Sequence, residues 1–162
     1  MMITTLLISW MHIMTWGAMT APAHVSEAGV SQLRSWFAQS ADSEEACRQL
    51  LNASAIGASV EHQGYHAVAH MMNARYLINP LDKLRSFNRG RNALDRLIQK
   101  HPRHLELRWL RHCVQQQAPS MLNYQQHMVE DVRVIRAVLK RTPDQALRDF
   151  ILEQDRRRNA WY

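Results

Sequence analysis

Residues 79–102 read NPLDKLRSFNRGRNALDRLIQKHP, with Asn79-Pro80 at one end and His101-Pro102 at the other. A proline disfavours helical backbone in the residue before it, so these two pairs mark the ends of a helix. At 100° per residue, the apolar positions between them fall within one arc of about 140°: Leu84, Phe87, Gly90, Leu94, Leu97 and Ile98. The segment therefore predicts an amphipathic helix over Leu81–Lys100 that packs on its neighbours.

Helix signals continue on the N-terminal side of this segment. We expect a short helix over Ser31–Gln39 and a second one that the cap sequence Asp42-Ser43-Glu44-Glu45 opens and that ends near Asn52. Ser59 is placed to cap a long helix that ends at Asn79-Pro80.

The C-terminal side shows the same pattern. We expect helices over Leu105–Gln117, from Ser120 to about Arg141, and from Thr142-Pro143-Asp144-Gln145 towards Gln154. Strand signals are weak, because there is no sustained alternation and no Asn-Gly or Asp-Gly turn. The chain therefore predicts an all-α fold of antiparallel helical hairpins, with six to seven helices.

The N-terminal residues resemble a targeting segment. Met1 to Ala23 contains no Lys, Arg, Asp or Glu, and Ala21-Pro22-Ala23 follows a mostly apolar run from Ile3 to Met19. This layout is typical of a secretory signal peptide. As a helix the run would span about 26 Å, less than the ~30 Å hydrocarbon core of a bilayer. We therefore expect cleavage after Ala23 rather than a retained membrane anchor, which remains the alternative.

Export and a single domain follow from this interpretation. We expect a periplasmic or secreted protein with one helical domain over 24–155, a basic frayed tail over 156–162 and no stable membrane span after cleavage. The 162 residues carry only two cysteines, too few for a disulfide-dense scaffold or a four-thiolate zinc site. With five glycines and no GxSxG or CxxC motif, no catalytic or nucleotide-binding signature is present. Whether the protein is an enzyme stays open, but the sequence favours a non-catalytic role.

Basic residues gather in the middle of the chain. The formal net charge is +6, and Arg75 to Arg111 holds ten basic residues against three acidic ones. Four of them lie within about 60° of one another, opposite the apolar arc of the 81–100 helix: Arg85, Arg89, Arg96 and Lys100. This basic stripe is either a solvated face or a surface that binds another protein or an anionic surface, such as phospholipid headgroups or polysaccharide. We do not expect nucleic acid as the partner of an exported protein.

Three histidines occur at helical spacing: His62, His66 and His70. On a helix they lie within about 80° of one another, but the eight-residue rise of about 12 Å prevents one ion from binding all three. A pair, His62 with His66 or His66 with His70, could bind a metal ion or haem with ligands from elsewhere. The alternatives are a polar stripe that lines a groove between helices and, last, acid–base catalysis; HExxH is absent.

Two further side-chain types raise structural questions. Glu106 falls inside the apolar arc of its helix, so we expect an arginine of a neighbouring helix to pair with it. Cys47 and Cys113 form either one disulfide or two separate buried thiols.

Two resemblances bear on the fold. Gly90, Leu94, Leu97 and Pro102 have the spacing that closes a tetratricopeptide hairpin, over about one repeat. Between Gly64 and Asp131 the chain resembles a group of small exported bacterial helical proteins without assigned activity, on a string that includes the following: Asn79-Pro80, Phe87-Asn88, Gly90, Pro102, Glu106, Arg108, Leu110-Arg111, Gln117-Ala118-Pro119, Tyr124 and Asp131. The resemblance implies an all-α fold and export, and it implies no chemistry. We therefore expect an interaction or scaffold protein, with metal or haem binding by the three histidines as the alternative.

Overall fold

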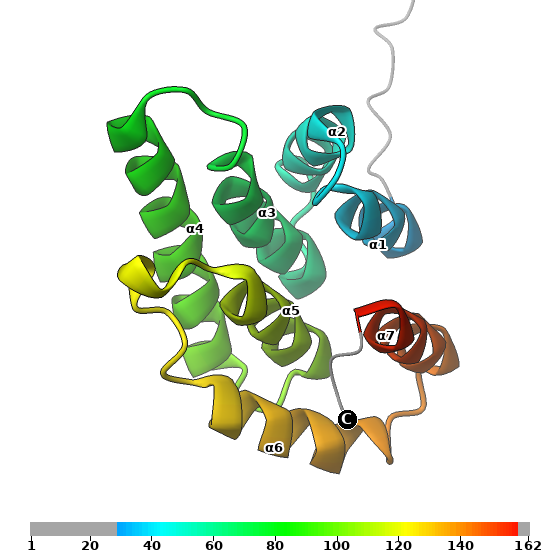
Figure 1. Ribbon diagram of the computed structural model, residues 1–162. Coiled ribbons are helices and arrows are strands. Elements are labelled where there is room, and N and C mark those ends of the chain that lie inside the picture. The colour runs from blue at the N-terminus through cyan, green and yellow to red at the C-terminus, as the bar shows by residue number, and fades with distance from the viewer. Residues whose placement is uncertain (1–28, 159–162) are drawn as a thin grey trace, which may run out of the picture.

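The computed structural model describes residues 29–158, which form seven α-helices and one short 3-10 helix and contain no strand (Figure 1). The elements are α1 (Val30–Gln39), α2 (Glu44–Ser54), α3 (Val60–Asn73), α4 (Pro80–Lys100), α5 (Leu105–Gln117), η1 (Ser120–Leu122), α6 (Met128–Leu139) and α7 (Gln145–Arg158). The prediction of an all-α fold is confirmed.

Helices that follow one another in the chain pack largely as antiparallel pairs, as Figure 1 shows for α1 to α4. The α3–α4 pair has the most extensive contact, and Gly90 lets these two helices approach closely. A Cβ atom at Gly90 would collide with the Ala67 carbonyl oxygen and come within 2.7 Å of Met71 Cγ. Gly64 on the other side of α3 has a similar role against Leu107 of α5. The absence of a side chain at Gly90 and at Gly64 thus allows α3 to pack closely against both α4 and α5.

The core is built around α5, in which every residue from Leu105 to Gln115 is buried. Trp109 is fully buried, and its ring packs edge-on against Phe37 of α1 and Phe150 of α7, at centroid distances of 5.5 and 5.2 Å. Phe37 also packs edge-on against Tyr65 of α3. One aromatic cluster therefore joins the two ends of the described chain to its middle.

The predicted helix starts are confirmed at three places. Ser43 and Ser59 accept hydrogen bonds from the backbone N–H groups of Ala46 and His62, and Asn79 caps α4 ahead of Pro80. α5 has the predicted bounds. The last helix starts at Gln145, within the expected stretch Thr142-Pro143-Asp144-Gln145, and Asp144 caps it by accepting a hydrogen bond from Leu147 N–H.

The predicted helix from Ser120 to Arg141 is wrong. Only Ser120–Leu122 forms a 3-10 turn, Asn123 adopts a left-handed conformation with φ 44°, and α6 begins at Met128. The physical reason is Tyr124, which is fully buried and packs its ring edge-on against Phe87. The break at Asn123 places the Tyr124 ring against Phe87, and this burial offsets the helical hydrogen bonds that residues 123–127 do not form.

Two other expected ends differ. α3 ends at Asn73 instead of continuing to Asn79, and α7 continues to Arg158 instead of ending near Gln154. Of the expected tail 156–162, residues 156–158 are therefore helical, and Arg157 pairs with Glu153 one turn earlier. The expected signal peptide over 1–23 and the last four residues lie outside the described part of the chain. Within residues 29–158, no helix is long and apolar enough to cross a membrane.

The questions about Glu106 and the cysteines are also resolved. Glu106 is 1% exposed and forms a two-point ion pair with Arg34 of α1, as expected for a carboxylate in the apolar arc. Cys47 and Cys113 are both buried and are not joined by a disulfide. Of the two alternatives for the cysteines, separate buried thiols are therefore observed.

Candidate functional site

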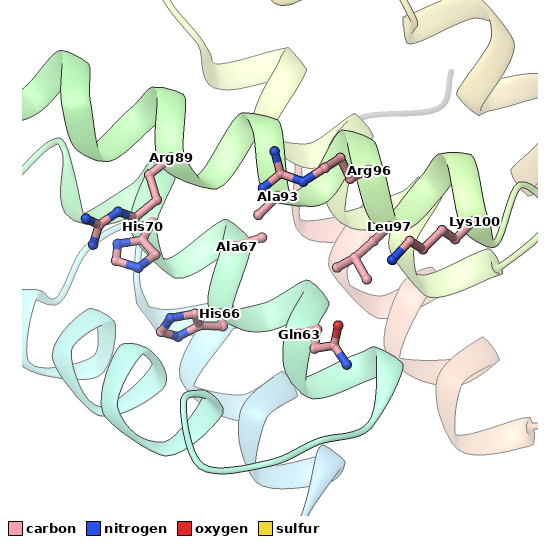
Figure 2. A pocket seen from close by; sticks show the side chains of 9 residues that line it. All are labelled: Gln63, His66, Ala67, His70, Arg89, Ala93, Arg96, Leu97 and Lys100. Atoms are coloured by element: carbon pink, nitrogen blue, oxygen red, sulfur yellow. The ribbon is translucent and has the colours of Figure 1, made fainter.

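A pocket of about 380 Å³ opens between α3 and α4 (Figure 2). We call it the cationic pocket. It is lined by Gln63, His66, Ala67 and His70 of α3 and by Arg89, Ala93, Arg96, Leu97 and Lys100 of α4. Two residue sets that the sequence suggested separately, the histidines and the basic stripe, therefore contribute to one site.

Helix periodicity explains why these side chains converge. On α3, Gln63, His66 and His70 are three and four residues apart and share one face. On α4, Arg89 and Arg96 are seven residues apart, two full turns, and Lys100 follows one turn later. The tight α3–α4 contact at Gly90 brings the two faces together along one seam (Figure 2).

The pocket has a strongly positive electrostatic character. None of the described residues that line it is a carboxylate, and Arg89, Arg96 and Lys100 form no ion pair within residues 29–158. Burial, the neighbouring His66 and the charge of Arg89 lower the pKa of His70 from 6.5 to about 4. His70 is therefore neutral at pH 7. The positive charges of Arg89, Arg96 and Lys100 are available to bind an anion that is not part of the described chain.

The two imidazoles of the pocket lie next to each other. The ring centroids of His66 and His70 are 4.7 Å apart, with the rings edge-on. His66 Nδ1 lies 3.2 Å from the Leu51 carbonyl oxygen and 3.3 Å from Ser54 Oγ. Ser54 Oγ itself donates to the Leu50 carbonyl oxygen. These contacts to α2 fix the orientation of the His66 ring, with its Nδ1 edge towards α2.

Two of the residues that the sequence suggested lie elsewhere. His62 is 4% exposed, does not line the pocket and has its Nδ1 2.9 Å from Ser59 Oγ. Arg85 lies beyond the pocket, is exposed and pairs with Asp82 at 3.2 Å. Gln63, which the sequence analysis did not single out, does line the pocket. Its place one turn before His66 is the signal that could have found it.

Neither a metal-binding arrangement among the described residues nor a similarity to known proteins assigns a function to this chain. Within residues 29–158, no group of three or more His, Cys, Asp or Glu side chains is arranged to hold a metal ion. No family model, curated protein or solved structure matches this chain. The chemistry of its own residues is therefore what indicates a function.

A second and larger hollow, of about 930 Å³, lies at the other end of the α3–α4 pair. We call it the apolar groove. Its lining comes from the C-terminal parts of α1, α3 and α5, the first turns of α4, and η1. No sequence pattern indicates this groove, because its segments are far apart in the chain and only their packing brings them around one space.

Proposed function

We propose that this protein is a non-catalytic, exported interaction protein whose cationic pocket binds an anionic group of a partner. The observation that carries the proposal is the set of three cations, Arg89, Arg96 and Lys100, without an acidic partner among the described residues. An acidic side chain or a phosphate placed in the pocket would pair with several of them at once. We also propose that the α3–α4 pair is a tetratricopeptide-like hairpin and that the chain is exported after loss of residues 1–23.

A binding role accounts for the pocket better than catalysis does. General acid–base chemistry needs a group that titrates near the working pH, whereas the pKa of His70 is far below neutrality. Among the described residues, the pocket lining also has no carboxylate that could activate either imidazole. Its cations can attract and hold an anion, which is what recognition of an acidic partner requires.

The test compares two triple variants that carry the same change in charge. The first, Arg89→Gln/Arg96→Gln/Lys100→Gln, removes the pocket's cations. The second, Arg85→Gln/Arg133→Gln/Lys140→Gln, removes two arginines and one lysine from exposed positions outside the pocket. Binding of a labelled oligo-glutamate peptide is measured by fluorescence anisotropy at low and at physiological salt.

We expect the pocket variant to weaken peptide binding about tenfold or more, because ~1.4 kcal/mol already corresponds to tenfold and three charged contacts are lost. The control should lose less than about threefold, since its three charges lie on α4 and on or directly after α6 and do not line the cationic pocket. Equal losses in both variants would show that net charge alone attracts the peptide and would contradict the proposal. Thermal melts of both variants establish that the fold is retained.

One observation favours the alternative, a metal- or haem-binding protein. Metal-ligating histidines commonly direct their second ring nitrogen to a backbone carbonyl, and His66 has such a contact with Leu51. His66 and His70 could then form a ligand pair, completed by groups from outside the chain. Zinc or haem uptake by untagged protein, measured by mass spectrometry and absorbance, tests this. Uptake that is lost in His66→Gln and His70→Gln but kept in His62→Gln would support the alternative, and absence of uptake would exclude it.

A further inference from the structure

The apolar groove is separate from the cationic pocket, and its walls are mostly hydrocarbon. Its floor consists of buried core side chains, among them Phe37, Met71, Phe87 and Val114, which are 1 to 9% exposed. Its rim is exposed, with Leu84 46% and Met121 86% accessible to solvent. A hollow of this size lies at the upper end of the range of about 300–1,000 Å³ for small-molecule sites, which are mostly apolar with a few polar groups.

Two cations stand at the α3–α4 side of the groove. Arg75 follows α3, Lys83 lies in the first turn of α4, and both line the groove. Neither forms an ion pair with a carboxylate within residues 29–158, unlike Arg85, which pairs with Asp82. An occupant with one negative group at this end would complement them.

Other polar groups of the groove are few and partly engaged. The Ser40 hydroxyl donates to the Trp36 carbonyl oxygen, and the Ser40 carbonyl oxygen accepts from the Tyr76 hydroxyl. Gln117 is the remaining polar side chain of the lining. An extended peptide brings a donor and an acceptor with each residue and would leave most of them without partners. An alkyl chain needs none.

A second copy of the protein fits the groove poorly. A symmetric dimer would place the same patch of both copies face to face, and the described residues that line the groove include no carboxylate to pair with Arg75 and Lys83 of the other copy. The chain also carries a formal net charge of +6, which opposes self-association.

From the apolar walls and the two cations at one side, we propose that the groove binds a long-chain fatty acid. The alkyl chain lies along Phe87, Met121 and the other apolar walls, and the carboxylate pairs with Arg75 and Lys83. Three methionines of the lining, Met71, Met72 and Met121, suit a flexible chain because their unbranched side chains adapt to irregular shapes.

The first experiment measures chain length and head group. Saturated carboxylates from eight to sixteen carbons, and the alcohols of the same lengths, are titrated into the full chain in detergent-free buffer below their critical micelle concentrations. Burial of one methylene contributes about 0.8 kcal/mol, about fourfold in affinity, so we expect binding to tighten up to about fifteenfold for each two carbons. The alcohols should bind at least about tenfold more weakly than the acids. One-to-one binding with both trends supports the proposal, whereas absence of binding or of a chain-length trend overturns it.

The second experiment uses variants with matched controls. Met121→Asp, at the groove rim, is compared with Val129→Asp on α6, because the two side chains are 86% and 84% exposed and neither change disturbs the core. Arg75→Gln/Lys83→Gln is compared with Arg85→Gln/Arg133→Gln. We expect the groove variants to weaken binding of the sixteen-carbon acid about tenfold or more, while the controls bind as the wild type does. In Arg75→Gln/Lys83→Gln the affinities for the acid and the alcohol should also become more similar. Equal effects in groove variants and controls would overturn the proposal.

Rival occupants are separated in the same series. Ile78, in the loop between α3 and α4, is 95% exposed, so a bilayer is the main rival. In a flotation assay, the wild type could bind phosphatidylglycerol vesicles while Met121→Asp does not. If the wild type also binds no fatty acid in solution, the groove docks on membranes and the proposal is wrong. A dimer in sedimentation equilibrium that Met121→Asp dissociates would overturn it in favour of a second copy.

Discussion

Arg34 of α1 and Glu106 of α5 form a two-point ion pair, with Nε–Oε1 and Nη2–Oε2 distances of 2.8 and 2.9 Å. The Tyr65 hydroxyl donates a third hydrogen bond to Oε1 at 2.6 Å. Three helices therefore meet at a carboxylate that is only 1% exposed. Because a buried charge without a partner is costly, this group holds α1 in place against α5.

Removal of the arginine should be strongly destabilising. We expect Arg34→Leu to lower the free energy of unfolding by about 3–5 kcal/mol, since it leaves Glu106 buried and unpaired. Arg48→Leu is the control, because its pair with Glu45 is 59% exposed on both sides and such pairs contribute less than about 1 kcal/mol. Urea denaturation at pH 7 measures both variants. Similar losses for the two would contradict the assigned role of Glu106.

A second buried carboxylate joins α6 to α5. Asp131 is fully buried and accepts from Arg108 Nη1 at 2.8 Å and from Arg111 Nε and Nη2 at 2.7 Å. We expect Asp131→Asn to cost about 3–5 kcal/mol and to speed hydrogen exchange throughout α6, because Arg108 and Arg111 lose their fully buried carboxylate and keep only the more exposed Glu130 and Asp95 as partners. The neighbouring Glu130 also pairs with Arg108 but is 47% exposed, so Glu130→Gln should cost less than about 1 kcal/mol. An Asp131→Asn protein as stable as Glu130→Gln would refute this prediction.

His70 should make stability depend on pH. Its pKa is lowered from 6.5 to about 4 in the folded protein, so between these values the unfolded chain binds more protons. The stability that neutral His70 allows is complete above pH 6.5 and is lost progressively as the pH falls towards 4. Urea denaturation from pH 7.5 to 4.5 should therefore show a shallower decline for His70→Gln than for the wild type. Gln63→Ala, a change at a non-titrating neighbour, should keep the wild-type slope, and a His70→Gln curve parallel to the wild type would contradict the prediction.

Gly90 should tolerate no side chain. Replacing glycine by alanine within a helix ordinarily stabilises by up to about 1 kcal/mol, so the sign of the effect is informative. Here the new methyl group would meet the Ala67 carbonyl oxygen and Met71, and we expect a loss of about 1–3 kcal/mol. Gly29→Ala is the control, because within residues 29–158 the only atom near its new methyl group is Ser31 Oγ at 3.8 Å. Thermal unfolding measures both, and a stabilised Gly90→Ala protein would show that α3 and α4 pack less closely than described.

The positions of most helices follow from local signals. The proline pairs and the caps Ser43 and Ser59 act over a few residues, so the starts of α2, α3 and α4 could be predicted before any packing was known. Glu106 was equally readable, because a carboxylate within an apolar arc needs a cation opposite it. Which arginine would pair with it was not, since Arg34 lies seventy-two residues away in the chain.

Errors arose where a distant contact overrides local preference. The apolar pattern around Met121 and Tyr124 favours one long helix, but Tyr124 is drawn into contact with Phe87 and the chain breaks at Asn123. In the same way, His62 belongs to the helical stripe of histidines yet is buried, and Arg85 belongs to the basic stripe yet lies beyond the cationic pocket. A helical wheel shows on which face of its helix a side chain lies, but it does not show which neighbouring helix covers that face.

The amino-acid sequence alone determines the helical class, most helix ends and the need for a buried cation beside Glu106. Capping, proline geometry and amphipathic periodicity operate within one or two turns, so these features depend on nearby residues. The union of the histidine and arginine stripes in the cationic pocket, the separation of Cys47 from Cys113 and the apolar groove arise only on packing. Each of these depends on which helix faces contact each other and how closely. Close packing of the whole core around Trp109 determines these contacts, so no single segment does.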